Sequence, residues 1–86
     1  MSEQIEDREK LWKTMLPKQA LVAANVNFRA LATKYEFTGG YIRNAVLRAA
    51  FLAADDNSAI TMQHLQRAAN LESAAMGKLA SSMGES

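Results

Sequence analysis

Cysteine is absent from the 86 residues of this chain, and proline occurs only once, at Pro17. Without cysteine the chain can form neither a disulfide framework nor a thiolate metal site, and nothing in it indicates an oxidising compartment. Long apolar runs are missing as well: none approaches the roughly 18 residues of a membrane span, and the residues after Met1 are mostly polar or charged. The sequence therefore predicts a cytoplasmic protein with no membrane partner.

An excess of charge of one sign is also missing. Ten Lys and Arg residues stand against nine Asp and Glu residues, so the net charge is +1 at pH 7. This balance does not indicate a nucleic-acid partner. The 49% hydrophobic content consists largely of Ala, Leu and Met, with few β-branched residues, which favours helices over strands. We therefore expect one small all-α domain of modest stability.

Apolar residues recur at separations of three, four and seven, which is the spacing of one helical face. This periodicity predicts four helices. The third is apolar around much of its circumference, so it is expected to lie at the centre of the fold. The helices cover residues 3–16, 27–35, 40–54 and 61–75, and the small, polar residues 77–86 follow as a flexible tail.

Local signals mark the ends of these helices. Pro17 ends the first, because proline lacks an amide hydrogen and disfavours a helical conformation in the residue before it. Asn27 and Thr61 are suitable N-caps for the second and fourth helices. The pair Gly39-Gly40 interrupts the apolar pattern and then opens the third helix.

Two segments carry a family resemblance: residues 37–50, FTGGYIRNAVLRAA, and residues 60–68, ITMQHLQRA. They resemble the small C-terminal helical subdomain, or lid, of AAA+ ATPases. In that family a Ser/Thr-Gly-Gly/Ala step starts the third lid helix, and an Ile-Thr-x-x-x-Leu-x-x-Ala pattern forms the last. Residues 8–17 and 26–32 resemble the first two lid helices. The match spans residues 8–72 and is most similar to bacterial members of the classical type.

This resemblance implies a parent protein that hydrolyses ATP. The chain itself has neither the Gly-rich loop ending in Lys-Ser/Thr nor the acid-ended strand that hold phosphate and magnesium, so it is expected to be inactive alone. In the family the nucleotide, ATP or ADP with Mg²⁺, lies between a large α/β subdomain and the lid. The lid also packs against the neighbouring subunit of a homo-oligomeric ring. The chain alone is expected to bind no cofactor, and its substrate protein is not implied.

The resemblance assigns nucleotide contact first to Gly39 and Gly40. A backbone without Cβ allows a base or ribose to approach closely, and the start of a helix presents free N–H groups. The alternative is that the pair merely forms a turn. Arg43 matches a lid arginine that senses the γ-phosphate in many AAA+ families, a role that suits a forked guanidinium. Its alternative is an exposed helix residue.

The first predicted helix contributes three further candidates, Leu11, Thr14 and Met15, at positions where the family places side chains beside the adenine. Each has a simpler interpretation: core packing for Leu11 and Met15, and surface exposure for Thr14. With Gly39, Gly40 and Arg43 they complete the candidate cofactor-binding residues.

Neither a catalytic nor a metal-ligating residue is expected. His64 has no second His or Cys with which to share a metal, and it is distant in sequence from any marked nucleophile. Asp55 and Asp56 form an acidic pair in a polar turn, which is typical of solvated turn residues. Trp12 lies on an apolar stripe and is expected either in the core or as an interface anchor.

Two other classes of function remain open. A short helix, a glycine turn and a following helix also describe helix-turn-helix proteins, so the chain could be a stand-alone module that binds protein or DNA. DNA binding is disfavoured, because residues 40–54 contain only two basic residues, Arg43 and Arg48, and otherwise display Tyr41, Ile42, Ala45 and Val46 near their start. The other class is a small bundle that oligomerises without a ligand.

Overall fold

The structure is a computed structural model that describes residues 2–85, and the side chains of residues 4–75 and 77. Its described residues form four helices, α1 (Ser2–Met15), α2 (Phe28–Lys34), α3 (Gly39–Asp55) and α4 (Met62–Glu85), and no strand. The all-α class expected from the sequence is therefore confirmed. Among the helices described, none combines the length and apolarity needed to cross a membrane.

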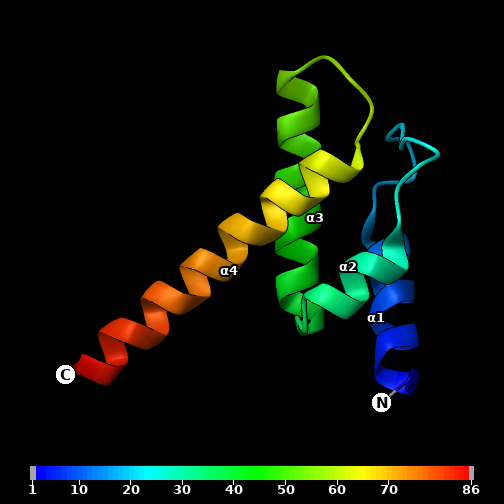
Figure 1. Cartoon of the computed structure of the whole chain (residues 1–86). Helices are drawn as coiled ribbons and strands as arrows, with labels where there is room; N and C mark the ends of the chain where they lie inside the picture. The colour runs from blue at the N-terminus through cyan, green and yellow to red at the C-terminus, as the bar shows by residue number, and fades with distance from the viewer. Residues whose placement is uncertain (1, 86) are drawn as a thin grey trace.

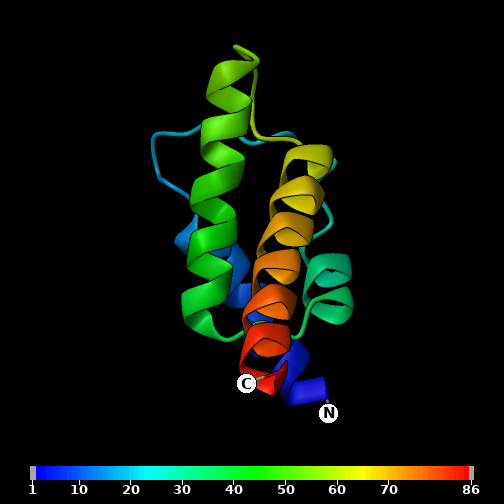
Figure 2. The same cartoon turned by 90° about the vertical axis from the view of Figure 1, so that its left-hand side faces the viewer.

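Helix α3 contacts both α1 and α4 and so links these two helices in the fold (Figure 1). Helix α4 packs against one side of α3. Figure 1 shows the two helices crossing at an angle, with the later part of α4 leading away from α3, and Figure 2 shows the same pair after a turn of 90°. Helix α1 packs against both α3 and the short helix α2. The central place predicted for the third helix agrees with these contacts.

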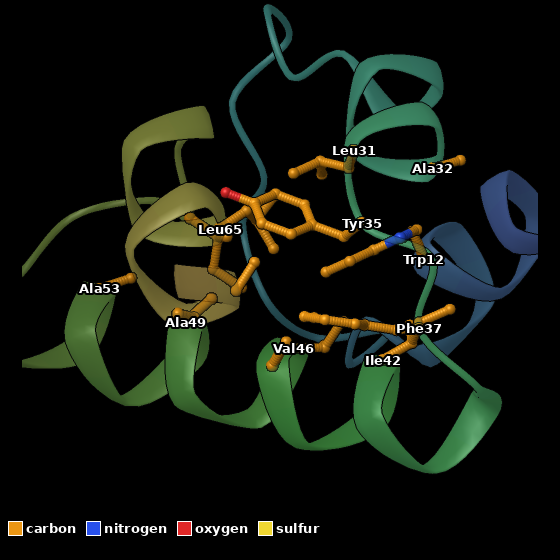
Figure 3. Packing of buried hydrophobic residues seen from close by; sticks show 14 residues of the cluster. Trp12, Leu31, Ala32, Tyr35, Phe37, Ile42, Val46, Ala49, Ala53 and Leu65 are labelled. Atoms are coloured by element: carbon orange, nitrogen blue, oxygen red, sulfur yellow. The ribbon is translucent and has the colours of Figure 1, made fainter. Parts of the chain in front are cut away.

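A few fully buried side chains join the helices in one core (Figure 3). Ile42 and Val46 face inward from α3, Leu65 adds to the same core from α4, and Trp12 comes from α1. The ring centroid of Trp12 lies 6.3 Å from that of Phe37, in the segment before α3. Because Trp12 is fully buried, its interpretation as an interface anchor is wrong and its core interpretation holds.

Three helix ends follow the local signals in the sequence. Helix α1 ends two residues before Pro17. Asn27 caps α2, and its Oδ1 accepts a hydrogen bond from the amide of Ala30 at 3.0 Å. Helix α4 begins after Thr61, whose Oγ1 accepts from the amide of His64 at 3.3 Å. The predicted N-caps are therefore confirmed.

Helix α4 is longer than predicted, since it continues to Glu85 rather than ending near residue 75. The segment 76–85, MGKLASSMGE, contains good helix formers and no proline. Gly77 and Gly84 weaken a helix without ending it. The predicted boundary is thus corrected, while the flexibility expected of residues 77–86 stays a prediction, because a helical range does not measure motion.

The connection between α1 and α2 pairs with the connection between α3 and α4. The amide of Ile60 donates to the carbonyl of Leu21, and the amide of Ala23 donates to the carbonyl of Ile60, each at 2.8 Å. Val22 and Ile60 form an isolated parallel bridge through these bonds. Because Ile60 is buried, the bridge ties both connections to the core.

A buried carboxylate links α3 to α4. Glu72 on α4 is only 5% exposed, and it accepts hydrogen bonds from Nε of Arg48 at 3.1 Å and from Nδ2 of Asn44 at 3.4 Å. A buried charge needs such partners, because losing one leaves it desolvated and unpaired. Arg48 is itself half exposed, so water moderates the strength of the pair.

We expect Arg48→Met to lower the free energy of unfolding by about 1–3 kcal/mol, because it leaves the buried carboxylate of Glu72 without its charged donor. The double variant R48M/E72M should be destabilised less than R48M alone, since it also removes the group that needs a partner. Urea denaturation of the two variants and the parent chain measures both effects. A double variant that is no more stable than R48M would contradict the assignment.

Candidate functional site

The start of α3 has no side-chain cap. Thr38 precedes the helix in an extended conformation, and its carbonyl accepts from the amide of Ile42 at 3.0 Å, but its hydroxyl makes no capping bond. The first turn also contains no acidic residue. The first N–H groups of a helix lack intrahelical acceptors and carry a partial positive charge. The N-terminus of α3 is therefore open to an external acceptor.

Glycine is not required here by the backbone. Neither Gly39 nor Gly40 has a positive φ. A Cβ built on Gly39 would lie 3.9 Å from Cδ1 of Leu11, an ordinary van der Waals distance, and one on Gly40 would meet nothing within 4 Å. The interpretation that the pair is needed to form the turn thus finds no support in its conformation. Because Gly40 has no side chain, the space outside the helix at this position is open.

A hollow of about 500 Å³ lies over this part of α3. Gly40 and Arg43 both line it, because residues three apart lie on the same side of a helix. Arg43 is exposed, and among the described side chains no carboxylate lies within ion-pair distance of it. Its guanidinium is therefore free to meet an anion in this hollow. The other lining residues are Thr38, Tyr41, Asn44 and Leu47.

The three candidates on α1 do not share this hollow. Leu11 is half-buried and faces Gly39, so it lies beside the start of α3. Met15 packs against the core. Thr14 is exposed, donates to the carbonyl of Leu11 at 3.4 Å, and lines a separate hollow of about 490 Å³ with Phe28 and the connection after α1. The structure thus brings Leu11 to the glycine pair and directs Thr14 elsewhere.

An apolar strip continues from the first hollow along α3. A smaller hollow of about 230 Å³ shares Asn44 and Leu47 with it and extends to Phe51 and Glu72. Phe51 is 75% exposed and Leu47 is 43% exposed. The sequence predicted a central third helix covered by neighbours on more than one side, and α1 and α4 provide that cover, but Leu47 and Phe51 stay exposed. The apolar circumference of the helix is wider than the face that the core covers.

His64 has partners that the sequence analysis missed. Its Nδ1 lies 2.9 Å from Oγ1 of Thr61, and its Nε2 lies 2.7 Å from Oδ2 of Asp56. The order hydroxyl, imidazole, carboxylate is that of a nucleophilic triad. However, Oγ1 of Thr61 already caps α4, and the hollows described above are lined by other residues. The sequence analysis considered only metal and catalytic roles for His64, and in the structure its contacts with Thr61 serve as a helix cap.

We expect Gly40→Ala to keep the fold and to raise the free energy of unfolding by up to about 1 kcal/mol. The reason is that alanine fits the space and loses less backbone entropy than glycine in a helix. Gly39→Ala, whose Cβ would contact Leu11, is the matched variant and should also be tolerated. Thermal denaturation measures both, and a loss of stability in G40A would show that the backbone does need glycine there.

The site can offer backbone N–H groups, one guanidinium and the side chains of Tyr41 and Leu47. Within the described residues no three His, Cys, Asp or Glu side chains gather where they could hold a metal ion. Binding of an anionic molecule through the start of α3 is therefore the chemistry that the arrangement suits. The chain matches no protein-family model and no curated protein sequence.

Proposed function

We propose that this chain is the helical lid of an ATP-hydrolysing AAA+ ATPase, acting in the cytoplasm beside a large α/β nucleotide-binding subdomain of the same protein. The order of the four motifs supports this assignment, and the helices lie where those motifs place them. The observation that carries it is the uncapped start of α3, where Gly40 leaves the outside of the helix open. The backbone conformation at Gly40 does not require glycine. A ligand that approaches the helix from outside would explain why this position has no side chain.

In this role the chain binds and responds to the nucleotide without cleaving it. The N–H groups at Gly39 and Gly40 face the ribose or base, and Arg43 reaches toward the phosphates from the same hollow. ATP or ADP with Mg²⁺ is held mainly by the large subdomain, which supplies the phosphate loop and the metal ligands. The apolar strip at Leu47 and Phe51 supports a second contact, with a neighbouring subunit of a ring.

The reading frame upstream of this chain in its source genome provides the first test. We expect it to encode, within about 200 residues, a Gly-rich loop ending in Lys-Ser/Thr and an apolar strand that ends in acidic residues. An independent start site directly before Met1, with its own ribosome-binding sequence, would sink the lid assignment.

In the intact ATPase we expect Arg43→Ala to lower kcat at least tenfold if the arginine stabilises charge on the transferred phosphate. Gly40→Val should instead raise the KM for ATP several-fold, because a branched side chain fills the approach to the helix start. Steady-state hydrolysis kinetics separate the two effects.

Arg67→Ala is the matched control for these variants, since Arg67 is an exposed arginine on α4 away from the hollow. It should leave both kcat and KM unchanged. Unchanged hydrolysis in R43A would remove the sensing role from Arg43, and unchanged KM in G40V would remove nucleotide contact from the glycine step.

A second candidate is a stand-alone protein-interaction module, which the exposure of Phe51 favours, because a large exposed aromatic residue is typical of interaction surfaces. This candidate predicts partner binding that depends on Phe51 and is insensitive to Gly40→Val. The lid assignment predicts sensitivity at Gly40 whatever the effect of Phe51.

A further inference from the structure

The imidazole of His64 connects the end of α3 to the start of α4. Its Nδ1 lies 3.0 Å from the amide nitrogen of Thr61 and 2.9 Å from Oγ1 of that residue. Its Nε2 lies 2.7 Å from Oδ2 of Asp56, the C-cap residue of α3. The side chain of His64 is only 11% exposed, whereas that of Asp56 is 65% exposed.

Thr61 and His64 cap α4 reciprocally. Oγ1 of Thr61 accepts from the amide of His64, and Nδ1 of His64 accepts from the amide of Thr61. This is the geometry of a capping box, in which Glu or Gln normally occupies the third helical position. The side chains of Glu and Gln accept a hydrogen bond near neutral pH whatever the exact pH. Histidine instead loses the acceptor on Nδ1 when its ring is protonated.

The hydrogen bonds assign the tautomer. Nδ1 must carry a lone pair to accept from the Thr61 amide, so in the neutral ring the hydrogen is on Nε2. Nε2–H then donates to the carboxylate of Asp56. A second proton can be added only at Nδ1, where it would donate to Oγ1 of Thr61 and leave the Thr61 N–H without its acceptor.

We infer that His64 is a pH-dependent cap: the neutral ring closes the capping box of α4, and the protonated ring releases the Thr61 amide and remains paired with Asp56. Histidine is the side chain whose charge ordinarily changes between pH 5 and 8. The cap is therefore closed when the ring is neutral and open when the ring is protonated.

The charges around the ring are few. Asp55 and Asp56 lie at the end of α3, and Arg67 lies three residues further along α4. The paired segment Leu21–Ala23 carries none. Of these charges, the structure places Asp56 within hydrogen-bond distance of the ring. Because the ring stays paired with Asp56 in both states, the proposed change is confined to the bond with the Thr61 amide.

The cap at Thr61 lies next to the pairing between the two connections. Ile60 directly precedes Thr61, and its amide and carbonyl pair with Leu21 and Ala23. A change at Thr61 would therefore occur next to the residue that attaches the connection between α1 and α2. This device belongs to the turn before α4, is separate from the start of α3, and does not depend on the proposed lid function.

Nuclear magnetic resonance of the whole chain across pH 5 to 8 tests the inference. At pH 8 the ring nitrogens of His64 should show hydrogen on Nε2 and a lone pair on Nδ1. As the ring is protonated, the protection of the Thr61 amide against hydrogen exchange, relative to the unstructured rate, should fall about five- to tenfold, the factor that one neutral hydrogen bond supplies. Both changes should share one midpoint.

Two variants make the test specific. His64→Glu restores the usual capping box, so its Thr61 amide should stay protected throughout pH 5 to 8. Asp56→Asn keeps an acceptor for Nε2 but removes the charge, so the midpoint should move to lower pH. The inference is overturned if Nδ1 carries the hydrogen at pH 8, if Thr61 protection does not follow the His64 titration, or if H64E shows the same pH dependence.

Discussion

The packing of the inner side of α3 against both α1 and α4 is the interaction on which the rest of the structure depends. Ile42 and Val46 on α3 share one core cluster with Trp12 and Leu65, and all four side chains are fully buried. A domain of this size has little apolar area to bury, so few alternative arrangements could satisfy these large residues together. The core therefore fixes the rotation of α3 about its axis, and with it the residues that α3 directs outward.

That fixed rotation explains why the candidate site lies where it does. With Ile42 and Val46 inward, Gly40, Asn44 and Leu47 must face outward at helical spacing. A rigid helix thus presents the open N-terminus and the apolar strip in one line. Glu72, paired with Arg48 beside this strip, adds a polar attachment between α3 and α4 that a purely apolar contact would not provide.

Local signals predicted most of the fold, and non-local contacts account for what was missed. Asn27 and Thr61 act on amides within three residues of themselves, so their capping roles could be read from sequence. The pairing of Ile60 with the segment 21–23 joins residues almost forty positions apart and has no sequence pattern of its own. The contact of His64 with Asp56 likewise requires the turn between α3 and α4 to fold back.

The same distinction between local and non-local contacts applies to the candidate site. Gly40 and Arg43 share a hollow because helical spacing brings them together, whereas the hollow that Thr14 lines depends on the tertiary path after α1.

The two ends of the outward line on α3 differ in chemistry, and this difference limits what could bind there. The first turn combines free N–H groups, no acidic side chain and the exposed guanidinium of Arg43, so it favours an anionic or strongly accepting group. Two turns further, Leu47 and Phe51 offer exposed apolar surface beside the pair of Arg48 and Glu72. A small molecule that fits the hollow at Gly40 would leave Phe51 uncovered, because Phe51 lines the adjoining hollow. Covering an aromatic side chain of this exposure requires a larger, apolar surface. A nucleotide at the helix start and a protein surface over the strip would therefore occupy different parts of α3, which is consistent with the proposed lid.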